Sequence, residues 1–374
     1  MKPRPYQQEA INAAVRHFKT KCQEHAVLVL PTAAGKSLII SRIVEQVGGS
    51  FLILQPSKEI LEQNIAKYRA LGKKATIYSA ILGEKKRSTV TFATIGSVMG
   101  NRKIFSQYKQ VLIDECHVVN PRTGQYQYLL NNIDRLVCVG LTATPYRLRP
   151  GSIPVIEFIT RTRPAVFQKV IHVTQQEELR EAGFLSPIAY KRRHEINLKN
   201  VVVRNGEYEE NSLLKEYNRV NVEDLIIQEI EAAEQSRKSI LVFVEFIEIL
   251  KKIQKKRPDL HVTGKTPPDQ RADLVHKFKT GQIQTAMNVG VLTTGFDHPE
   301  LDTIIVAKAT KSLSLWYQIV GRGQRIHPDK TDCLVVDMCD NLSVLGDVQA
   351  LKVLQVKDKW VVKINHRIIT NTVL

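Results

Sequence analysis

Two short polar stretches carry side chains suited to phosphate chemistry. Pro31-Thr32-Ala33-Ala34-Gly35-Lys36-Ser37 directly follows the apolar run Ala26–Leu30, and Asp114-Glu115-Cys116-His117 ends the apolar run Val111–Ile113. Each is a polar cluster at the end of a predicted buried strand, and this edge of an open α/β sheet is where ligands bind. Together they offer a phosphate-binding loop, a lysine, oxygen ligands for a metal ion and an acid–base group. These are the requirements of nucleoside triphosphate hydrolysis.

The first stretch places Gly-Lys-Ser at a strand-to-helix turn, where backbone N–H groups and a helix N-terminus face an anion. We expect Lys36 to reach the β- and γ-phosphates and the Ser37 hydroxyl to bind Mg²⁺. Leu30 stands at the first position of the G-x-x-x-x-G-K-[ST] pattern, so an ordinary loop remains the alternative. The residues expected to hold the nucleotide here are Thr32, Ala33, Ala34, Gly35, Lys36 and Ser37.

The second stretch ends a strand-like run, so the two adjacent carboxylates point in different directions. Asp114 is expected to hold the metal ion, directly or through water, and Glu115 to orient and deprotonate the attacking water. The alternative for two adjacent acids is a solvated turn. We interpret Cys116 as a small packing residue and His117 as a link between nucleotide state and neighbouring segments.

Six further stretches follow a recognisable order along the chain. They are Arg4-Pro5-Tyr6-Gln7, Pro56-Ser57-Lys58-Glu59, Thr94-Ile95-Gly96-Ser97, Leu141-Thr142-Ala143-Thr144-Pro145, Val291-Leu292-Thr293-Thr294-Gly295-Phe296-Asp297 and Gln318-Ile319-Val320-Gly321-Arg322-Gly323-Gln324-Arg325. With the first two stretches, this ordered set resembles the motifs of superfamily 2 helicases of the DEAH-like kind, written here as D-E-C-H. The resemblance spans roughly residues 4–340.

Within that superfamily the chain resembles the RadD-type bacterial helicase-like repair ATPases, near the type III restriction helicase-subunit family. The stretches that carry this likeness are Arg4–Ala10, Asn288–Asp297 and Gln318–Gly323. Two departures stand out. RadD-type proteins usually have Gly where this chain has Ala33, which raises the question of whether Ala can adopt the loop conformation there. They also carry a cysteine-rich C-terminal extension, and this chain stops near where that extension would begin.

The resemblance implies further nucleotide contacts. Those expected at the N-terminus are Arg4 and Gln7, with Gln7 bonding the adenine edge, and those expected later are Gly295, Asp297 and Gln318, with Asp297 bonding the ribose. Arg322 and Arg325 would neutralise charge on the γ-phosphate from the second domain. The Q-x-x-G-R-x-x-R spacing predicts one helical face for Gln318 and the two arginines, whose alternative role is phosphate binding by a basic surface.

The same resemblance implies contacts to a nucleic-acid backbone. The residues expected there are Pro56, Ser57, Lys58, Thr94, Ser97, Arg147, Thr293 and Thr294. Hydroxyl and cationic donors of this kind bind phosphate oxygens without reading sequence, so we expect sequence-independent, salt-sensitive binding. Thr142 and Thr144 are expected to relay domain closure; simple capping of a strand end is the alternative.

Bulk composition agrees with a polyanionic partner. The 374 residues include 54 Lys and Arg against 37 Asp and Glu, a formal net charge of +17. Such an excess favours nucleic acid over a membrane as partner, and a solubility effect spread over the surface is the alternative. The 5 cysteines form no C-x-x-C pair, which is typical of a reducing cytosol, and the sequence shows neither an apolar signal segment nor a membrane span. We therefore expect a cytoplasmic protein.

Apolar runs that alternate with helix-like segments predict two α/β units, each a mostly parallel sheet flanked by helices. The predicted domains are residues 1–185, residues 186–342 and a tail at 343–374 of unclear role. The predicted strands are Ala26–Leu30, Phe51–Leu54, Thr91–Ala93, Val111–Ile113 and Leu136–Gly140, then Ser239–Val244, His261–Thr263, Thr285–Val291, Thr303–Ala307 and Cys333–Val336. The predicted helices include Gln175–Ala182, Asn211–Lys238, Asp269–Lys279 and Ser314–Val320, and Trp360–Ile364 is β-like.

The sequence therefore predicts two tandem RecA-like domains with a nucleotide cleft between them. The predicted function is that of an ATP-dependent nucleic-acid motor, a helicase or translocase that uses ATP and Mg²⁺. DNA is favoured as its track, in repair, recombination or replication. The alternatives are an RNA helicase, the motor subunit of a restriction or defence complex, and a non-catalytic nucleotide-gated clamp.

Overall fold

The computed structural model describes residues 2–20, 23–133, 136–149, 155–262, 268–290 and 297–372. The chain forms two compact units. Unit 1 comprises Met1–Arg149, Val155–Glu178 and Lys352–Leu374, and unit 2 comprises Pro150–Pro154 and Leu179–Leu351. The change of unit near residue 178 lies close to the domain change expected at residue 185. Of the tail predicted at 343–374, the part Lys352–Leu374 belongs to unit 1 and the part before it to unit 2.

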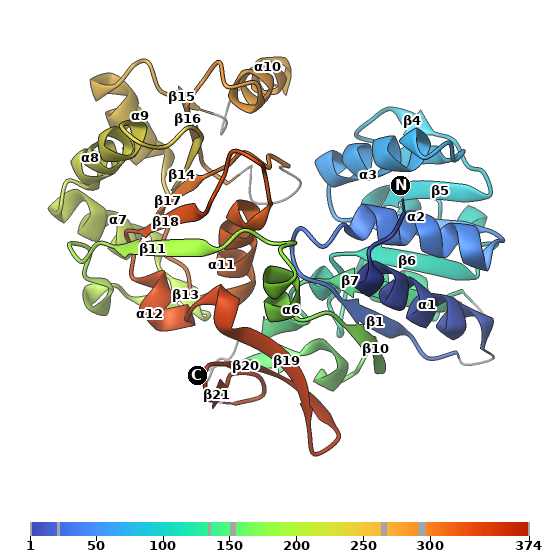
Figure 1. The fold of residues 1–374 in the computed structure, drawn as a ribbon. Helices are drawn as coiled ribbons and strands as arrows, with labels where there is room; N and C mark the ends of the chain where they lie inside the picture. Colours follow the sequence, from blue (N-terminus) through green and yellow to red (C-terminus); the bar gives the residue numbers. More distant parts are fainter. Residues whose placement is uncertain are drawn as a thin grey trace. The chain divides into compact units, whose positions relative to one another are not determined.

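An eight-stranded sheet forms the centre of unit 1, in the order β10-β1-β7-β6-β2-β5-β3-β4 (Figure 1). The pairings are parallel, except that β4 runs antiparallel to β3. The inner strands are continuous apolar runs because helices cover both faces of a parallel sheet. The strands are β1 (Ala26–Val29), β2 (Phe51–Gln55), β3 (Thr76–Ser79), β4 (Glu84–Lys85), β5 (Val90–Thr94), β6 (Gln110–Asp114), β7 (Val137–Thr142) and β10 (Lys169–Val173).

Three neighbouring strands bring the polar clusters of unit 1 to one edge of the sheet. Val29, the last residue of β1, pairs with Thr142 of β7, and Asp114 of β6 pairs with Leu141 of β7. The segments that follow these strands therefore begin side by side. The main helices of unit 1 are α1 (Pro5–Lys19), α2 (Lys36–Val47), α3 (Lys58–Ala70), α4 (Ile95–Met99) and α5 (Gln125–Asn131).

Unit 2 is built on a second, fully parallel sheet in the order β11-β18-β17-β14-β16-β15. Its strands are β11 (Ile188–Arg192), β14 (Ile240–Val244), β15 (His261–Val262), β16 (Thr285–Asn288), β17 (Thr303–Ala307) and β18 (Cys333–Asp337). Its helices include α7 (Glu210–Arg219), α8 (Val222–Glu234), α9 (Ile247–Lys256), α10 (Pro268–Lys279) and α11 (Leu313–Val320). The mostly parallel α/β architecture predicted from the sequence is confirmed in both units.

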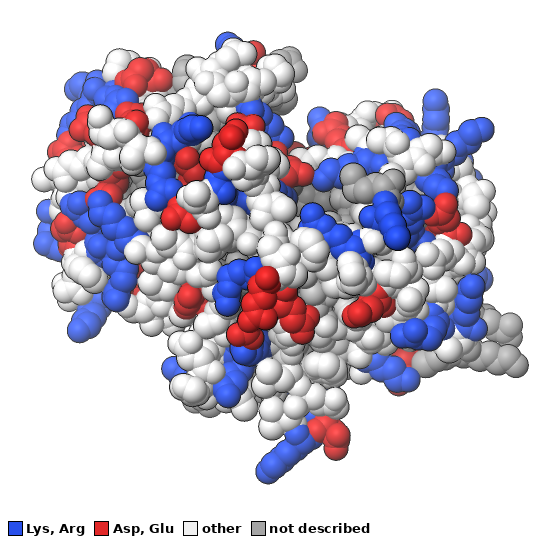
Figure 2. All heavy atoms as spheres, viewed as in Figure 1, with Lys and Arg blue, Asp and Glu red and all other residues white. Residues whose placement is uncertain are grey.

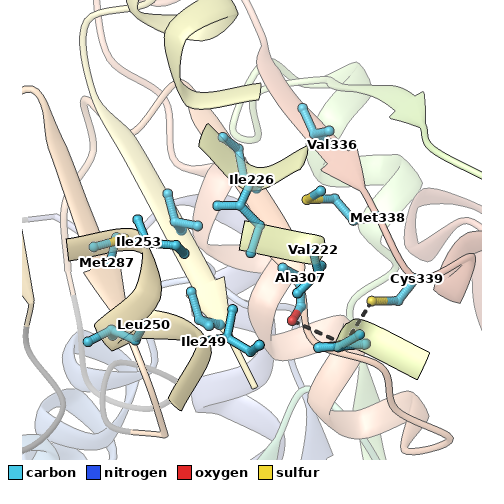
Figure 3. Close-up of a cluster of buried hydrophobic side chains, with 14 of the residues drawn as sticks. Val222, Ile226, Ile249, Leu250, Ile253, Met287, Ala307, Val336, Met338 and Cys339 are labelled. Carbon is cyan, nitrogen blue, oxygen red and sulfur yellow. Dashed lines mark hydrogen bonds between the residues drawn. The ribbon is translucent and has the colours of Figure 1, made fainter. Parts of the chain in front are cut away.

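The core of unit 2 lies where α8 and α9 pack on the sheet. Figure 3 shows Ile226 of α8, Ile249 of α9 and Val336 of β18 within one buried apolar cluster. The Tyr217 hydroxyl lies inside this cluster, 3.2 Å from the Ala307 carbonyl oxygen and 3.1 Å from the Cys339 sulfur. The buried hydroxyl is thus satisfied within an otherwise apolar core.

The prediction of a single long helix at Asn211–Lys238 is wrong in that the helix is interrupted. The segment forms two helices, α7 and α8, because Asn221 adopts a left-handed conformation with φ 49° between them. Asn enters this region at low cost through local hydrogen bonding of its side chain. The helices predicted at Gln175–Ala182, Asp269–Lys279 and Ser314–Val320 are confirmed as α6 (Gln176–Glu181), α10 and α11.

The C-terminal segment forms a three-stranded sheet of β19 (Leu351–Val356), β20 (Lys359–Ile364) and β21 (Arg367–Ile368). Its attachment to unit 1 is specific. The Gln175 side chain donates to the Val353 carbonyl at 2.6 Å and accepts from the Val353 N–H at 3.1 Å, and the Asn371 side chain accepts from the Phe158 N–H at 3.2 Å. The β-like character predicted for Trp360–Ile364 is confirmed in β20.

Four cysteines, Cys116, Cys138, Cys333 and Cys339, are buried and form no disulfide, and burial raises the pKa of each thiol. Cys22 lies outside the described residues. Within the described ranges, none of the helices combines the length and apolar character needed to cross a membrane.

Candidate functional site

The loop between β1 and α2 has a backbone that only small residues adopt easily. Gly35, directly before α2, has φ 78°, and Ala33 has φ 63°. A Cβ atom at Gly35 would lie 2.5 Å from Nε2 of Gln7, closer than side-chain contacts allow. Glycine at this position avoids the strain of a positive φ and leaves room for the Gln7 side chain.

The N-terminal segment of α1 packs directly on this loop. The Gln7 side chain donates to the Ala34 carbonyl at 2.9 Å and accepts from the Arg4 N–H at 2.9 Å, and the Tyr6 hydroxyl donates to the same Ala34 carbonyl at 3.1 Å. The segment expected to read adenine thus lies against the predicted phosphate loop. The adenine contact itself stays a prediction.

The predicted catalytic lysine and general base form an ion pair. Lys36 Nζ lies 2.9 Å from Glu115 Oε1, and both side chains are largely buried. Glu115 has φ 51°, because the chain turns sharply out of β6 at this residue. The two adjacent carboxylates contact different partners: Asp114 accepts from the Asn64 amide, and Glu115 pairs with Lys36.

A residue that sequence reasoning missed, Asn64 of α3, joins the two predicted metal ligands. Its side-chain oxygen accepts from the Ser37 hydroxyl at 2.6 Å, and its amide nitrogen donates to Asp114 Oδ2 at 2.9 Å and to the Gln55 side-chain oxygen at 3.0 Å. The sequence held one signal for it. Asn64 is a polar residue within the buried stripe of α3, where its neighbours are Leu61, Ile65 and Tyr68.

The oxygen atoms at this point suit a magnesium ion. The Ser37 hydroxyl and the Asp114 carboxylate are hard oxygen donors of the kind Mg²⁺ prefers, and both bond to the same amide group. Burial raises the pKa of Asp114, and the neighbouring Glu115 carboxylate adds to this, whereas Lys36 and the Asn64 hydrogen bond oppose it. A bound cation would favour the ionised carboxylate further. The residues present therefore fit the metal that the resemblance implies.

The D-E-C-H stretch is tied to the end of β7. His117 Nδ1 lies 2.9 Å from the Thr142 hydroxyl and 3.5 Å from Glu115 Oε2, and the Thr142 hydroxyl accepts from the Thr144 N–H at 3.0 Å. Burial lowers the pKa of His117, which favours its neutral form. Thr142 thus caps the end of its strand. Its contact with His117 is also one through which domain closure could be relayed, as proposed from the sequence.

Unit 2 holds Arg322 and Arg325, the two arginines expected to neutralise charge on the γ-phosphate, but they do not lie on one face of an α-helix. Helix α11 ends at Val320, a 3₁₀ turn covers Gly321–Gln324, and Arg325 is extended. The expectation that Gln318, Arg322 and Arg325 share one face of an α-helix is therefore wrong, because the helix tightens and ends between them. Arg325 Nε lies 2.8 Å from Asp297 Oδ1, so the residue expected at the ribose pairs with this arginine.

A second residue missed from the sequence holds this turn in place. The Lys330 ammonium donates to the carbonyl oxygens of Gly323 at 2.7 Å, Arg325 at 2.6 Å and Leu301 at 2.9 Å. It therefore ties the turn that carries Arg322 to the segment that follows Asp297. A single lysine in a polar loop gives no sequence signal for such a role. Gly295, Thr293 and Thr294 lie outside the described residues.

The expected nucleic-acid contacts have structural partners of their own. Ser57 caps α3 and accepts from the Ile60 N–H, with Pro56 and Lys58 partly exposed beside it. The Ser97 hydroxyl lies 3.0 Å from the Thr94 hydroxyl and accepts from the Ala80 N–H at 2.8 Å. Arg147 donates to the Val119 carbonyl at 2.6 Å, which ties it to the D-E-C-H segment.

Basic side chains are spread over the face drawn in Figure 2, interspersed with acidic ones. On that face the positive charge is distributed rather than gathered in one patch. The binding role of the contacts named above stays a prediction.

Comparison with known proteins relates both units to nucleic-acid motors. Residues 1–147 match the family described as type III restriction enzyme, res subunit, and residues 221–327 match the helicase conserved C-terminal domain. IRC3 of Saccharomyces cerevisiae, named as an ATP-dependent helicase, is 25% identical over 95% of this chain. The DNA 3'-5' translocase XPB2 of Sulfurisphaera tokodaii is 24% identical over 85% of this chain and 77% of its own length.

Solved structures agree on the fold. A fragment named as the HsdR subunit of a type I restriction enzyme from Vibrio vulnificus superimposes with a TM-score of 0.69 at 20% identity, over 92% of this chain and 66% of that one. The chain spans 54% of the length of the yeast relative. The two domain matches, the ordered motifs and the shared fold agree with one another. In its two domain matches and in the relatives named above, this chain is therefore similar to superfamily 2 helicases.

Proposed function

We propose that this chain is the motor of an ATP-dependent helicase or translocase that acts on DNA. The observation that carries the proposal is the group formed by Lys36, Ser37, Asp114 and Glu115 at one edge of the unit 1 sheet. Ser37 and Asp114 share the Asn64 amide, and Lys36 pairs with Glu115 at 2.9 Å. Phosphate binding, metal binding and proton abstraction then fall within one small site.

The Lys36–Glu115 ion pair suggests how nucleotide would switch the site on. A triphosphate is a stronger partner for the lysine than one carboxylate, so phosphate binding would draw Lys36 away from Glu115. The released carboxylate would then accept a proton from the attacking water. Mg²⁺, held by Ser37 and Asp114 with the phosphates, would supply charge neutralisation. Arg322 and Arg325 would stabilise the charge that develops on the γ-phosphate.

DNA is the proposed track because similar proteins, such as the archaeal DNA 3'-5' translocase XPB2, are named for acting on DNA and align with most of this chain. Contact through phosphates would make binding sequence-independent and salt-sensitive. Repair, recombination and replication-fork processing are the proposed settings, and the cytosol is the proposed location. A second candidate, the motor subunit of a restriction complex, is favoured by the match of residues 1–147 to the type III restriction family.

The test is steady-state ATPase activity, alone and with single-stranded DNA, duplex DNA, forked DNA and RNA at one low salt concentration. We expect strong stimulation by a DNA form. Stimulation by RNA alone would assign the chain to RNA metabolism, and high activity indifferent to all four would mean that hydrolysis is not coupled to nucleic acid.

Three variants assign the chemistry. Lys36→Ala should bind nucleotide weakly and lose turnover, Glu115→Gln should bind ATP but hydrolyse it very slowly, and Arg325→Ala should lose about three powers of ten in turnover with little change in affinity. Lys74→Ala, at an exposed loop lysine of unit 1, is the control and should behave as the unmodified protein. Normal hydrolysis by the Glu115 variant would assign the base elsewhere.

A further inference from the structure

The Asn64 side chain uses its hydrogen-bonding groups on three partners from three different elements. Ser37 lies in the first turn of α2, Asp114 ends β6 and Gln55 ends β2. The side chain is buried, and so are Gln55 and Asp114. Both amide protons face carboxylate or amide oxygens, and the side-chain oxygen faces a hydroxyl, so the orientation of the group is fixed by its partners.

This arrangement sets the distance between the two predicted metal ligands. Without the amide, the Ser37 hydroxyl would lose its 2.6 Å partner, and the Asp114 carboxylate would keep the Glu115 N–H at 3.0 Å but lose the donor that faces Ser37. Replacing a residue that hydrogen-bonds to metal ligands, and so fixes their orientation, commonly lowers metal affinity by about 10- to 100-fold. Asn64 has the position and the bonding pattern of such a group.

Asn64 is linked to both ends of the segment 56–58, which is predicted to contact nucleic acid. One link is its hydrogen bond to Gln55, and the other is the helix that carries it. Gln55 directly precedes that segment at the end of β2, and α3, which carries Asn64, begins directly after its Ser57 cap. An α-helix rises about 1.5 Å and turns about 100° per residue, so Asn64 lies within two turns of the start of α3. A displacement of segment 56–58 would therefore reach Asn64 through the strand end and through the helix.

We propose that Asn64 is a positioning residue that holds Ser37 and Asp114 in place for Mg²⁺ and couples them to the nucleic-acid-contacting segment 56–58. The coupling part rests on the proposed motor function, whereas the positioning part rests on the bonding network alone. Asn64 itself takes no part in proton transfer. Its effect is to make metal binding, and hence hydrolysis, depend on what segment 56–58 contacts.

The test compares Asn64→Leu, which keeps the branching and the number of heavy atoms and removes the hydrogen bonds, with the unmodified protein. The first measurement is the affinity for a fluorescent ATP analogue in EDTA and in Mg²⁺. The ratio of the two affinities should fall about tenfold or more in the variant, with the EDTA value unchanged within twofold. The second measurement is the ATPase rate with DNA divided by the rate without DNA. This ratio should fall toward one in the variant.

Glu62→Ala on the exposed side of α3 is the matched control, and Asn64→Ala is the second variant if Leu prevents folding. An unchanged Mg²⁺ effect and unchanged stimulation would overturn the proposal. So would parallel losses of EDTA affinity and melting temperature, because they would show general damage. If the unmodified protein is not stimulated by any nucleic acid, the motor function fails, but the affinity ratio still decides the positioning role.

Discussion

Ala33 occupies the backbone position where the resemblance leads one to expect glycine. Its φ of 63° is in the left-handed region, where a Cβ atom meets the following carbonyl oxygen at a cost of about 1–2 kcal/mol. The loop before Lys36 therefore holds a small amount of strain. The question of whether Ala can adopt this conformation is answered by the structure, in which it does.

Replacing Ala33 with Gly should relieve this strain. We expect Ala33→Gly to raise the melting temperature of unit 1 by about 2–4 °C, for a gain near 1 kcal/mol, measured by calorimetry. Ala34→Gly is the matched control, because Ala34 is buried and is not among the residues with positive φ. It should lower the melting temperature. Equal destabilisation by both changes would show that Ala33 carries no strain.

Single residues were predictable only where a motif marks them. Lys36 and Glu115 stand in short patterns with a chemical reason for each position, and the structure brings them together. Asn64 and Lys330 act through contacts that are remote in sequence or lie in a polar loop, so residue type alone gives little sign of them. Three-dimensional proximity is what reveals such residues.

The inner strands were predictable because burial on both faces makes them continuous apolar runs. The edge strands β10 and β11 were missed because they are only partly buried, and their sequences mix Lys, His and Arg with apolar residues. The break between α7 and α8 was missed because Asn221 is compatible with a helix and acts only through its left-handed conformation. The type of most inner elements could be predicted from the pattern of apolar residues. Where an element ends depends on backbone conformations, such as that of Asn221, which the pattern does not reveal.

The start of β14 is tied to the segment before β17 by a buried histidine. His298 Nε2 lies 2.8 Å from the Ser239 hydroxyl, and burial, aided by Lys279 and Lys330, lowers the pKa of His298 to about 4. The unfolded chain takes up a proton at about pH 6.5, whereas the folded chain does so only near 4. The stability of this junction is thus complete above pH 6.5 and declines as the pH falls toward 4.

We expect unit 2 to lose up to about 3 kcal/mol of stability over this pH range from His298 alone. His298→Gln should flatten the dependence, because glutamine keeps a polar group near Ser239 and does not titrate. Denaturant titrations at several pH values measure the slope. His276→Gln, at an exposed histidine of α10, is the control and should leave it unchanged. A slope that survives in His298→Gln would assign it to other groups.

At the scale of the whole chain, unit 1 is completed by residues far from it in sequence. Residues 352–374 return to unit 1 after the chain has formed unit 2. Val353, Val362 and Ile364 are buried in this segment. Fully burying such side chains contributes about 1.5–3 kcal/mol each, so together they rival the whole stability of a small domain. This burial favours a structural role for part of the tail at 343–374, whose role was unclear from the sequence.

Removing residues 352–374 should therefore weaken unit 1 and spare unit 2. Hydrogen exchange followed by mass spectrometry should show lost protection in β1, β7 and β10, with unit 2 strands unchanged. The matched control replaces Lys357-Asp358, which form the β19–β20 turn with φ 46° and 60°, by Asn-Gly. That change suits the turn and should preserve protection. Unchanged exchange in the truncated chain would mean that the C-terminal sheet is dispensable.

The buried cysteines have a practical consequence for studying movement. Maleimide dyes react with the thiolate, and burial both hides the sulfur atoms of Cys116, Cys138, Cys333 and Cys339 and disfavours their thiolates. A Cys22→Ser background with one new surface cysteine in each unit would therefore accept a donor and an acceptor dye at chosen points. Energy transfer within single molecules could then follow the separation of the two units through each round of nucleotide binding and release.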